Sequence, residues 1–196
     1  MNHMWYNYEG CIPLSIVDAI REVCLRKPLK ASEIDIQSSN KVNKNIRSSQ
    51  TAFLAQNEHS KIYELFTDFA HKSNNAAFGF DINNIETLQF TVYNEKDKDY
   101  YDWHEDTHWM TKEMSHRKLT MVLQLSDPSE YEGGQLELKE SKKDKNAVSI
   151  SEQDRKDIMK KGSIIVFPSF FTHRVAPVTK GTRLSLVAWV SGPLFR

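Results

Sequence analysis

The sequence contains few cysteines and no long uninterrupted hydrophobic run, and these two absences exclude several classes of protein. Of its 196 residues only Cys11 and Cys24 are cysteines, and they do not form the C-x-x-C pair that is typical of zinc and redox sites. The apolar stretch at residues 12–20 contains a proline, a serine and an aspartate, so it is too short and too polar for a signal peptide or a membrane span. We therefore expect a cytoplasmic protein with reduced thiols.

The sequence also lacks an excess of either charge. Lysine plus arginine number 26, and aspartate plus glutamate also number 26. A protein with this balance has no overall field that would hold it on nucleic acid or on an anionic membrane. We therefore expect neither nucleic acid nor membrane among its partners, and we look for function in a local site.

Length and composition predict one domain. A chain of this size with 39% hydrophobic residues can bury one substantial core but is too short for two ordinary domains. No internal repeat, low-complexity tract or linker divides it. We expect a single domain over residues 1–196, in which residues 1–84 support a core formed by residues 85–196.

Two segments in the first part of the chain have helical spacing. From Pro13 to Lys27 apolar residues recur every three or four positions, and a proline suits the first turn of a helix. A second segment with one apolar face lies between Glu58 and Lys72. Residues 29–55 alternate loosely, which predicts two strands joined by a solvated turn.

From Ile85 onward the sequence changes to short segments rich in β-forming residues. The pattern predicts a mainly β core with flanking helices (an α+β fold), arranged as a sandwich, a jelly roll or a small barrel. A polar helix or turn over residues 151–161 interrupts the series, and the lysine-rich residues 141–145 are typical of a solvated hairpin loop. The eight expected strands are ETLQFTVY, YYDWHED, RKLTMVLQLS, GQLELK, AVSI, GSIIVFPS, THRVAPV and TRLSLVAWVSG.

The segment YYDWHED contains a candidate metal site. Strand alternation would place His104 and Asp106 on the same face, with Cα atoms roughly 7 Å apart, so that both side chains reach one ion. His173, on a later strand, would supply the third ligand. Two histidines and one carboxylate on a β-scaffold are the triad typical of non-haem Fe(II) oxygenases, and it leaves coordination positions open. H-x-D alone is a common pattern, and a solvated histidine beside an aspartate would explain it as well.

Arg183 strengthens the metal hypothesis. It stands ten residues after His173, at a G-T-R turn that we expect to begin the last strand, in a mostly apolar segment. A dicarboxylate co-substrate held at the metal needs a fixed cation at its far end, and a guanidinium binds a carboxylate through two hydrogen bonds. Ser185, on the same strand face, would add a hydroxyl group. A surface arginine paired with an acidic neighbour is the alternative interpretation.

With these residues assembled, the sequence resembles the 2-oxoglutarate- and Fe(II)-dependent dioxygenases, and within them the prolyl 4-hydroxylase-like group that includes the bacterial PKHD-type hydroxylases. The resemblance covers about residues 85–192, with a weaker echo in NIRSSQTAFL, and it rests on LSDPSEYEGGQLEL and GSIIVFPSFFTHRVAPVTKGTRLSLVAW. It implies a double-stranded β-helix core (a jelly-roll, cupin-like fold). It also implies Fe(II), 2-oxoglutarate and O2 as cofactors, with ascorbate as a reductant, and hydroxylation of an unactivated C–H bond with release of succinate and CO2.

The resemblance implies roles for four further residues. Tyr93 matches a tyrosine whose hydroxyl reaches the distal carboxylate of the co-substrate, and Tyr101 matches an aromatic residue that lines the metal pocket. Thr120 lies on a strand that contributes a small polar residue to the same pocket. Gln124 stands where relatives often have an aromatic residue, so its contacts with the co-substrate are expected to differ. Tyrosine and threonine are also common strand residues, which would explain Tyr93, Tyr101 and Thr120 without a functional role.

Two glycines in EYEGGQLEL, Gly133 and Gly134, are expected to be structural. A residue without Cβ allows a tight turn or a close approach of two backbones where sheets cross.

The substrate is the least determined part of the hypothesis. Trp103, His108 and Trp109 bracket the first two ligands and either line the substrate entrance or pack structurally. A prolyl residue in a peptide or protein is the leading hypothesis, and a free amino acid or another small molecule is the alternative. We expect a monomer or a weak homodimer.

His108 leaves open a function of another class. His104, Asp106 and His108 would share one strand face and, with His173, could form a zinc site. This hypothesis gives Arg183 no role. A non-catalytic jelly-roll binding protein is a third possibility, although a lost activity usually shows as a missing ligand and none is missing here.

Overall fold

The computed structural model describes residues 5–36, 39–107, 109, 114–139 and 152–195. The expected strand AVSI and the expected hairpin loop at residues 141–145 lie outside the described residues, and so does His108.

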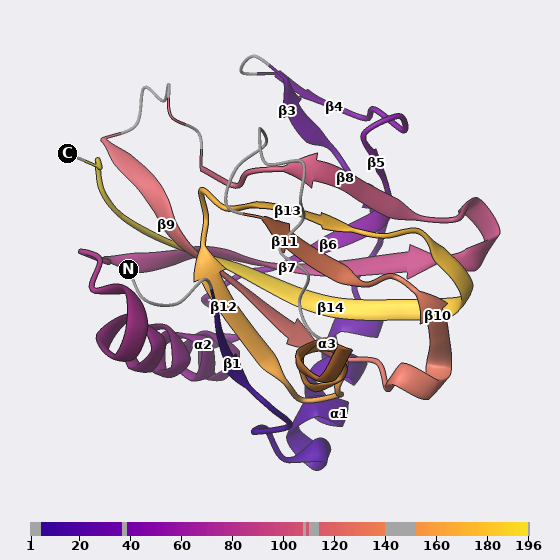
Figure 1. Ribbon diagram of the computed structural model, residues 1–196, viewed down its shortest axis with the longest axis horizontal. Helices are drawn as coiled ribbons and strands as arrows, with labels where there is room; N and C mark the ends of the chain where they lie inside the picture. Colours follow the sequence, from indigo (N-terminus) through magenta and orange to yellow (C-terminus); the bar gives the residue numbers. More distant parts are fainter. Residues whose placement is uncertain (1–4, 37–38, 108, 110–113, 140–151, 196) are drawn as a thin grey trace.

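An eight-stranded antiparallel sheet is the larger layer of the molecule (Figure 1). Apolar and polar residues alternate along its central strands, so one face of each strand packs on helices and the other faces the second sheet. In spatial order the strands are β1 (Tyr6–Tyr8), β12 (Ile164–Pro168), β9 (Ser115–Gln124), β14 (Val178–Pro193), β7 (Asn84–Asn94), β6 (Gln50–Leu54) and β2 (Lys30–Ala31), and β10 (Tyr131–Gly133) pairs with β14.

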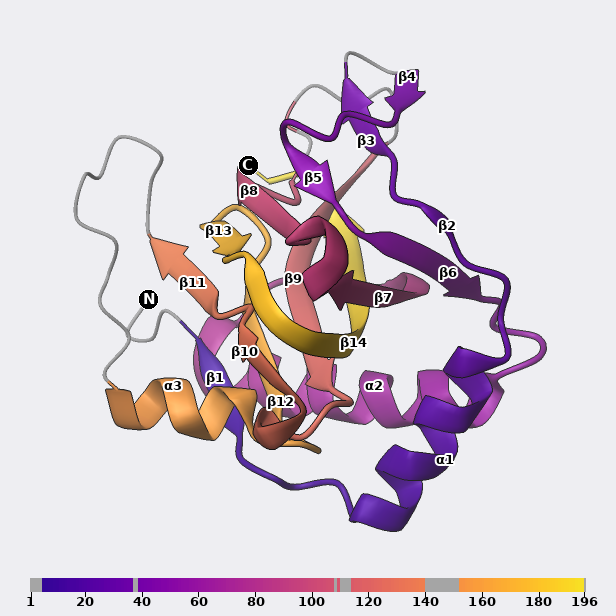
Figure 2. The same ribbon diagram turned by 90° about the vertical axis from the view of Figure 1, so that its right-hand side faces the viewer.

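A four-stranded antiparallel sheet lies opposite the larger one (Figures 1 and 2). The chain passes from one sheet to the other between β12, β13 and β14, which is the connectivity expected of a double-stranded β-helix. This crossing carries His173 on the smaller sheet and Arg183 on the larger one. The strand order of the smaller sheet is β11 (Leu136–Lys139), β13 (Thr172–Val175), β8 (Tyr100–His104) and β5 (Arg47–Ser48).

Residues 29–55 form more strands than the two that the sequence predicts. The prediction is wrong because this segment serves three sheets in turn, and each short strand is defined by a distant partner rather than by a local pattern. β5 pairs with β8, and β6 pairs with β7. The strands in this segment are β2, β3 (Ile34–Ile36), β4 (Ser39–Lys41), β5 and β6, and β3 and β4 form a two-stranded sheet of their own.

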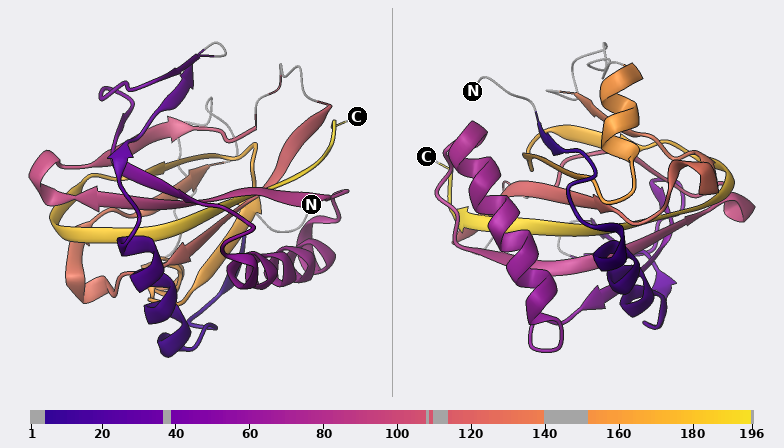
Figure 3. Two further views of the ribbon diagram at one scale, coloured as in Figure 1. Left: turned by 180° about the vertical axis from the view of Figure 1, so that it is seen from behind. Right: turned by 90° about the horizontal axis from the view of Figure 1, so that it is seen from below.

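Helices α1 (Leu14–Leu25) and α2 (Ser60–Ser73) cover the outer face of the larger sheet (Figure 3). Both begin and end within two residues of the predicted bounds. They pack on the outward-facing apolar residues of β7, β9 and β14, and burial of this surface is the main stabilising contribution to the layer. The remaining helical elements are η1 (Asn74–Phe78), η2 (Glu95–Asp97), η3 (Pro128–Glu130) and α3 (Glu152–Met159). Within the described ranges, no helix is long and apolar enough to cross a membrane.

The space between the two sheets has an apolar part and a polar part. A second cluster of buried apolar side chains, which includes Phe167, Leu138 and Val178, fills the apolar part and packs on α3. The inward-facing residues at the centre of the larger sheet are instead small and polar. This row of hydroxyl and amide groups forms the floor of a pocket, and its buried members are Thr51, Gln89, Thr91, Thr120 and Ser185.

The last strand differs from the prediction in its start. Gly181 does not form a turn that precedes the strand, because β14 already begins at Val178 and continues without interruption. Gly181 has φ +70° and lies opposite Tyr131 of β10. A Cβ there would stand 2.0 Å from the carbonyl oxygen of Glu130, so the glycine permits a close contact between backbones inside the sheet.

Candidate metal centre and co-substrate pocket

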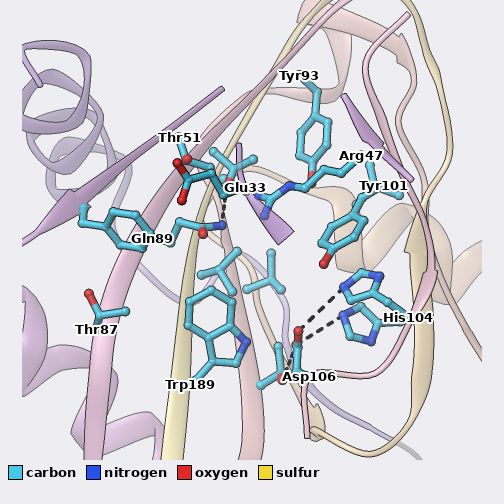
Figure 4. Close-up of a pocket in the computed structure, with 18 of the residues that line it drawn as sticks. Glu33, Arg47, Thr51, Thr87, Gln89, Tyr93, Tyr101, His104, Asp106 and Trp189 are labelled. Atoms are coloured by element: carbon cyan, nitrogen blue, oxygen red, sulfur yellow. Dashed lines mark hydrogen bonds and ion pairs between the residues drawn. The ribbon is translucent and has the colours of Figure 1, made fainter. Parts of the chain in front are cut away.

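The three predicted metal ligands lie together in space. One ligand atom from each of His104, Asp106 and His173 lies within 4.8 Å of the others. The two imidazoles lie next to each other, with ring centroids 4.1 Å apart, and both face the carboxylate of Asp106 (Figure 4), whose Oδ1 is 3.7 Å from His104 Nε2 and whose Oδ2 is 3.3 Å from His173 Nε2. In the described part of the chain no other group of three such side chains is close enough to hold an ion.

The path of the backbone explains this arrangement, although not in the way that strand alternation suggests. His104 is the last residue of β8 and lies directly opposite His173 in the antiparallel pair formed with β13. Asp106 lies beyond the end of β8, in a loop whose backbone N–H donates to the carbonyl oxygen of Ser169 at 2.8 Å. The expected common strand face is therefore wrong in detail, and a loop hydrogen bond turns Asp106 toward the histidines.

Backbone carbonyl groups fix the orientation of both imidazoles. His104 Nδ1 lies 2.7 Å from the carbonyl oxygen of Asp102, and His173 Nδ1 lies 3.0 Å from that of Phe171. A carbonyl oxygen only accepts hydrogen bonds, so each Nδ1 must donate, and each neutral ring then presents the lone pair of Nε2. This tautomer is the one that binds a metal through Nε2 with a supported outer nitrogen. The donor set thus fits a divalent metal ion.

The electrostatics of the site favour an ionised carboxylate. Burial lowers the pKa of His104 to about 3, and the charge on His173 adds to this effect. Burial by itself would raise the pKa of Asp106, but the two neighbouring histidines hold the pKa of that carboxyl below its usual range. Burial likewise opposes the charged form of His173, yet the attraction of Asp106 raises the pKa of His173. Asp106 is therefore a carboxylate ligand throughout the physiological pH range.

The hydroxyl of Thr120 holds the Asp106 carboxylate from the side of the larger sheet, and the hydroxyl of Ser169 lies beside that of Thr120. Thr120 Oγ1, on β9, donates to Asp106 Oδ2 at 2.8 Å and lies 2.9 Å from Ser169 Oγ. Thr120 and Ser169 are fully buried, so these hydrogen bonds are protected from water.

Tyr101 and Arg47 form a stack on the other side of the metal site. The ring of Tyr101 lies against that of His104 with centroids 3.5 Å apart and planes inclined by 12°. The guanidinium of Arg47 also lies over the Tyr101 ring, with its Cζ 4.6 Å from the ring centre. Burial raises the pKa of Tyr101, so its hydroxyl remains protonated.

A cavity of about 940 Å³ connects the triad with Arg183. Arg183 is 1% exposed, and its Nη2 donates to Gln124 Oε1 at 3.0 Å. Its Nε and Nη1 are buried and have no hydrogen-bond partner among the described residues. A buried guanidinium with unsatisfied N–H groups is strongly unfavourable unless an anion binds it. The pocket therefore fits a ligand with a carboxylate at this end, as a dicarboxylate held at the metal would provide.

Gly134 makes room for this arginine. A Cβ at Gly134 would lie 3.0 Å from Cδ of Arg183 and equally close to Val178. The expected structural role of Gly134 is thus seen in the close packing around it.

Most of the other predicted site residues share this cavity. The side chains of Tyr93, Tyr101, Thr120, Ser185 and Trp103 line it. Tyr93 is buried beside Arg183, whose Cζ lies 5.5 Å from the centre of the tyrosine ring, and burial raises the pKa of the Tyr93 hydroxyl.

Two predicted residues lie elsewhere. Gln124 does not line the cavity but stands behind Arg183 and accepts its hydrogen bond, so its expected direct contact with the co-substrate is replaced by a supporting one. Trp109 is about half exposed and packs against His116 and Phe195 rather than lining the cavity. His108 lies outside the described residues, so the proposed zinc ligand is not placed.

Several residues that line the cavity were not predicted from the sequence, and Arg47, Arg117 and Trp189 are three of them. Arg47 lies in the segment NIRSSQTAFL, whose resemblance was noted without a role for the arginine. Arg117 stacks on Trp189, with Cζ 4.2 Å from the indole centre, and Trp189 Nε1 is buried without a partner among the described residues. Trp189 could have been found from alternation, because it lies six residues after Arg183 and therefore on the same face of β14.

A family model and a curated relative match this chain. The model of the 2OG-Fe(II) oxygenase superfamily matches residues 88–191, which is more than half of the chain. A PKHD-type hydroxylase of Prochlorococcus marinus is 38% identical over 90 residues, which cover 46% of this chain and 35% of the relative. This chain therefore spans much less than the full length of that curated relative.

Solved structures match almost the whole chain, although their sequences are only distantly similar to it. A prolyl-4-hydroxylase of Pseudomonas putida matches with a TM-score of 0.68 at 21% identity, covering 96% of this chain and 92% of that one. The viral collagen prolyl hydroxylase of Paramecium Bursaria Chlorella virus-1, in complex with 2OG, matches with a TM-score of 0.65 at 19% identity and covers 97% of both chains. At these identities the likeness concerns the fold, and it confirms the predicted double-stranded β-helix.

Proposed function

Because this chain belongs to the 2OG-Fe(II) oxygenase superfamily, we propose that it hydroxylates an unactivated C–H bond with 2-oxoglutarate as co-substrate. We assign His104, Asp106 and His173 as the iron ligands and Arg183 as the residue that binds the distal carboxylate of 2-oxoglutarate. The observation that carries the proposal is that two buried nitrogen atoms of Arg183, Nε and Nη1, have no hydrogen-bond partner among the described residues and that Arg183 shares one cavity with the triad.

Iron and 2-oxoglutarate, when bound, supply the oxidising chemistry, in which O2, 2-oxoglutarate and a C–H bond yield succinate, CO2 and a hydroxylated product. The protein provides position and exclusion of water. The carbonyl groups of Asp102 and Phe171 orient the two imidazoles, and Thr120 fixes the Asp106 carboxylate. Ascorbate fits the proposal as an external reductant that returns the metal to Fe(II).

Tyr93 and Ser185 complete the proposed co-substrate site. Both line the cavity next to Arg183, and Arg183 pairs with Tyr93 in the antiparallel register of β7 and β14. Ser185 lies on the same face of β14 as Arg183. We expect their hydroxyl groups to donate to the distal carboxylate, so that three side chains would determine which 2-oxo acid fits.

For the substrate we propose a prolyl residue in a peptide or protein. The PKHD-type relatives and the two prolyl hydroxylase structures support this choice by their names. Trp103 lines the cavity, but Lys139 and Arg174 lie over its ring, so this residue does not support the choice. The alternative is the same reaction on a free amino acid or another small molecule, which would need the same iron and co-substrate residues.

The reaction class can be tested by spectroscopy without knowledge of the substrate. Under argon, addition of Fe(II) and then 2-oxoglutarate should produce a visible charge-transfer band, and His104→Ala or Asp106→Ala should abolish it. A purified protein that retains zinc and shows no band would contradict the oxygenase assignment and favour the zinc-site hypothesis.

The role of Arg183 makes a separate prediction. Arg183→Gln removes the buried charge, so the dissociation constant of 2-oxoglutarate should rise by about 30-fold or more, since truncation of one partner in a buried charge pair costs 2–5 kcal/mol. Fe(II) affinity, measured by titration of the same variant, should change little. Equal loss of both affinities would instead give Arg183 a structural role. Turnover of proline-containing peptides and free amino acids, followed by succinate release and product mass, then identifies the substrate.

A further inference from the structure

The cavity contains a second buried arginine that the proposed reaction does not use. Arg47, at the start of β5, is 6% exposed and lines the cavity together with the triad. Its guanidinium points into the cavity near Tyr93 and Tyr101 (Figure 4). Burial raises the pKa values of Tyr93 and Tyr101 and lowers that of His104, and the nearby charge of Arg47 lowers all three.

Arg47 has no anionic partner in the described part of the chain. Its Nε donates to Ser49 Oγ at 2.9 Å, and the rest of the guanidinium makes only the cation–π contact with Tyr101. No carboxylate of the described residues forms an ion pair with it, and the nearby Asp99 is already bonded to Ser48 Oγ and to the backbone N–H of Asn94. The two terminal nitrogen atoms of Arg47 are not among the fully buried, unpartnered atoms of the described residues, so they reach the open space of the cavity, where an anionic ligand can bind them through two hydrogen bonds.

The charges in the inner cavity show that the iron and co-substrate do not satisfy Arg47. Fe(II) contributes two positive charges and Asp106 one negative charge. Arg183 contributes one positive charge, and 2-oxoglutarate two negative charges, so these four groups sum to zero. Arg47 then leaves one positive charge in excess.

None of the other charged side chains around the cavity forms an ion pair with Arg47 in the described part of the chain. Arg117 pairs with Glu86, and Lys27 pairs with Glu58. The carboxylate of Glu105 accepts hydrogen bonds from two neutral donors, Thr172 and Trp109, which hold it away from Arg47 but leave its negative charge uncompensated. Lys30 and Glu33, of opposite charge, are both exposed.

We propose that Arg47 binds a carboxylate group of the primary substrate, so that the enzyme acts on an anionic substrate rather than on a neutral prolyl segment. This inference rests on the proposed function and narrows its substrate class. Arg47 stacks on Tyr101, which in turn stacks on His104, so the carboxylate would lie next to the metal site. It therefore belongs to the reacting residue or to its immediate neighbour. Two sources share this chemistry, a C-terminal carboxylate and an acidic side chain adjacent to the reacting residue.

Matched pairs of small ligands test the proposal and distinguish the two sources. N-acetylproline and its amide differ only in the terminal carboxylate, and acetyl-Glu-Pro-amide and acetyl-Gln-Pro-amide differ only in the side-chain carboxylate. Binding is measured by calorimetry under argon, with the full chain loaded with Fe(II) and 2-oxoglutarate. In at least one pair the acid should bind about 30-fold or more tightly than the amide, and that pair identifies the source.

Variants connect the preference to Arg47. In Arg47→Gln the acid and the amide should bind alike, whereas Arg47→Lys should keep part of the preference because it retains the charge but loses the planar fork. Lys30→Gln, which removes an exposed cation from the rim of the same cavity, should leave the preference unchanged. The charge-transfer band of Arg47→Gln serves as the control for an intact metal site.

The outcomes separate this inference from the proposed function. If wild-type protein gives no charge-transfer band with Fe(II) and 2-oxoglutarate, the proposed function is wrong. If the band forms but no acid binds more tightly than its amide, or if the preference persists in Arg47→Gln, the carboxylate role of Arg47 is wrong. Should Arg47→Gln lose the band, the comparison of acids with amides in the wild-type protein still decides whether the substrate is anionic.

Discussion

A single hydroxyl group connects the carboxylate of Asp106 to the larger sheet. Asp106 lies in the loop after β8, whereas Thr120 lies on β9, so their 2.8 Å hydrogen bond joins a loop to a rigid strand. Ser169, which also accepts the backbone N–H of Asp106 through its carbonyl oxygen, places its own hydroxyl beside that of Thr120. The position of the carboxylate is thus determined by residues that would not contact the metal.

We predict that Thr120→Val weakens Fe(II) binding by about 10- to 100-fold, the usual effect of losing a group that supports a ligand. Valine has nearly the shape of threonine but cannot donate to Asp106. Thr120→Ser keeps the hydroxyl and should bind Fe(II) much like the wild type. The measurement is an anaerobic titration of Fe(II) into each variant, and equal affinities for the valine and serine variants would show that the hydrogen bond does not support the ligand.

At the residue scale, the sequence allowed the candidate site to be selected where a residue type and its spacing indicated the chemistry. His104, Asp106, His173 and Arg183 could be selected because each would supply a specific ligand or charge, and the fold brings them to one cavity. Arg47 could not be selected in this way, since an arginine in a polar segment gives no local sign that the chain will bury it.

At the scale of elements, local pattern was sufficient only for strands with a local signal. β7, β9, β12 and β14 each contain five or more consecutive residues rich in β-forming types and were predicted, whereas β2 and β5 contain two residues each and exist only through their partners. Local pattern also could not predict that β10 packs closely on the connection between β13 and β14. The sequence shows two glycines there, but not which backbone approaches them.

The close packing of β10 makes a prediction about stability. Gly133 has φ +78°, and a Cβ there would stand 2.2 Å from the carbonyl oxygen of Pro177. Gly79 has a similar φ of +68°, but nothing lies within 4 Å of the position of its Cβ. Gly79→Ala should therefore cost only the backbone strain of about 1–2 kcal/mol, whereas Gly133→Ala should cost an additional 1–3 kcal/mol or so from the forced displacement.

Urea unfolding of both alanine variants measures these two costs on the same scale. The difference between them isolates the steric contribution, because the left-handed backbone conformation is common to both positions. Equal losses of unfolding free energy would mean that the strands at β10 move apart without cost.

At the scale of the whole molecule, the residues proposed to bind the metal and the co-substrate come from both sheets. His104 and His173 belong to the smaller sheet, and Arg183 belongs to the larger sheet. A 2-oxoglutarate molecule bound to both the metal and Arg183 would cross the interior. Binding would therefore stabilise the fold as a unit, by an amount that depends on ligand concentration and affinity.

We predict that Fe(II) and 2-oxoglutarate together raise the melting temperature more than the sum of their separate effects, because the chelating end of 2-oxoglutarate needs the metal. At 100 times its dissociation constant each ligand adds up to about 2.7 kcal/mol to the free energy of unfolding. Thermal unfolding under argon, with each ligand alone and with both, measures the effect. In Arg183→Gln the shift due to Fe(II) should remain while that due to 2-oxoglutarate falls, and in His104→Ala both shifts should be small. If 2-oxoglutarate stabilises the wild-type protein equally with and without Fe(II), it binds away from the triad, because a ligand that shares the metal site must gain affinity from the metal.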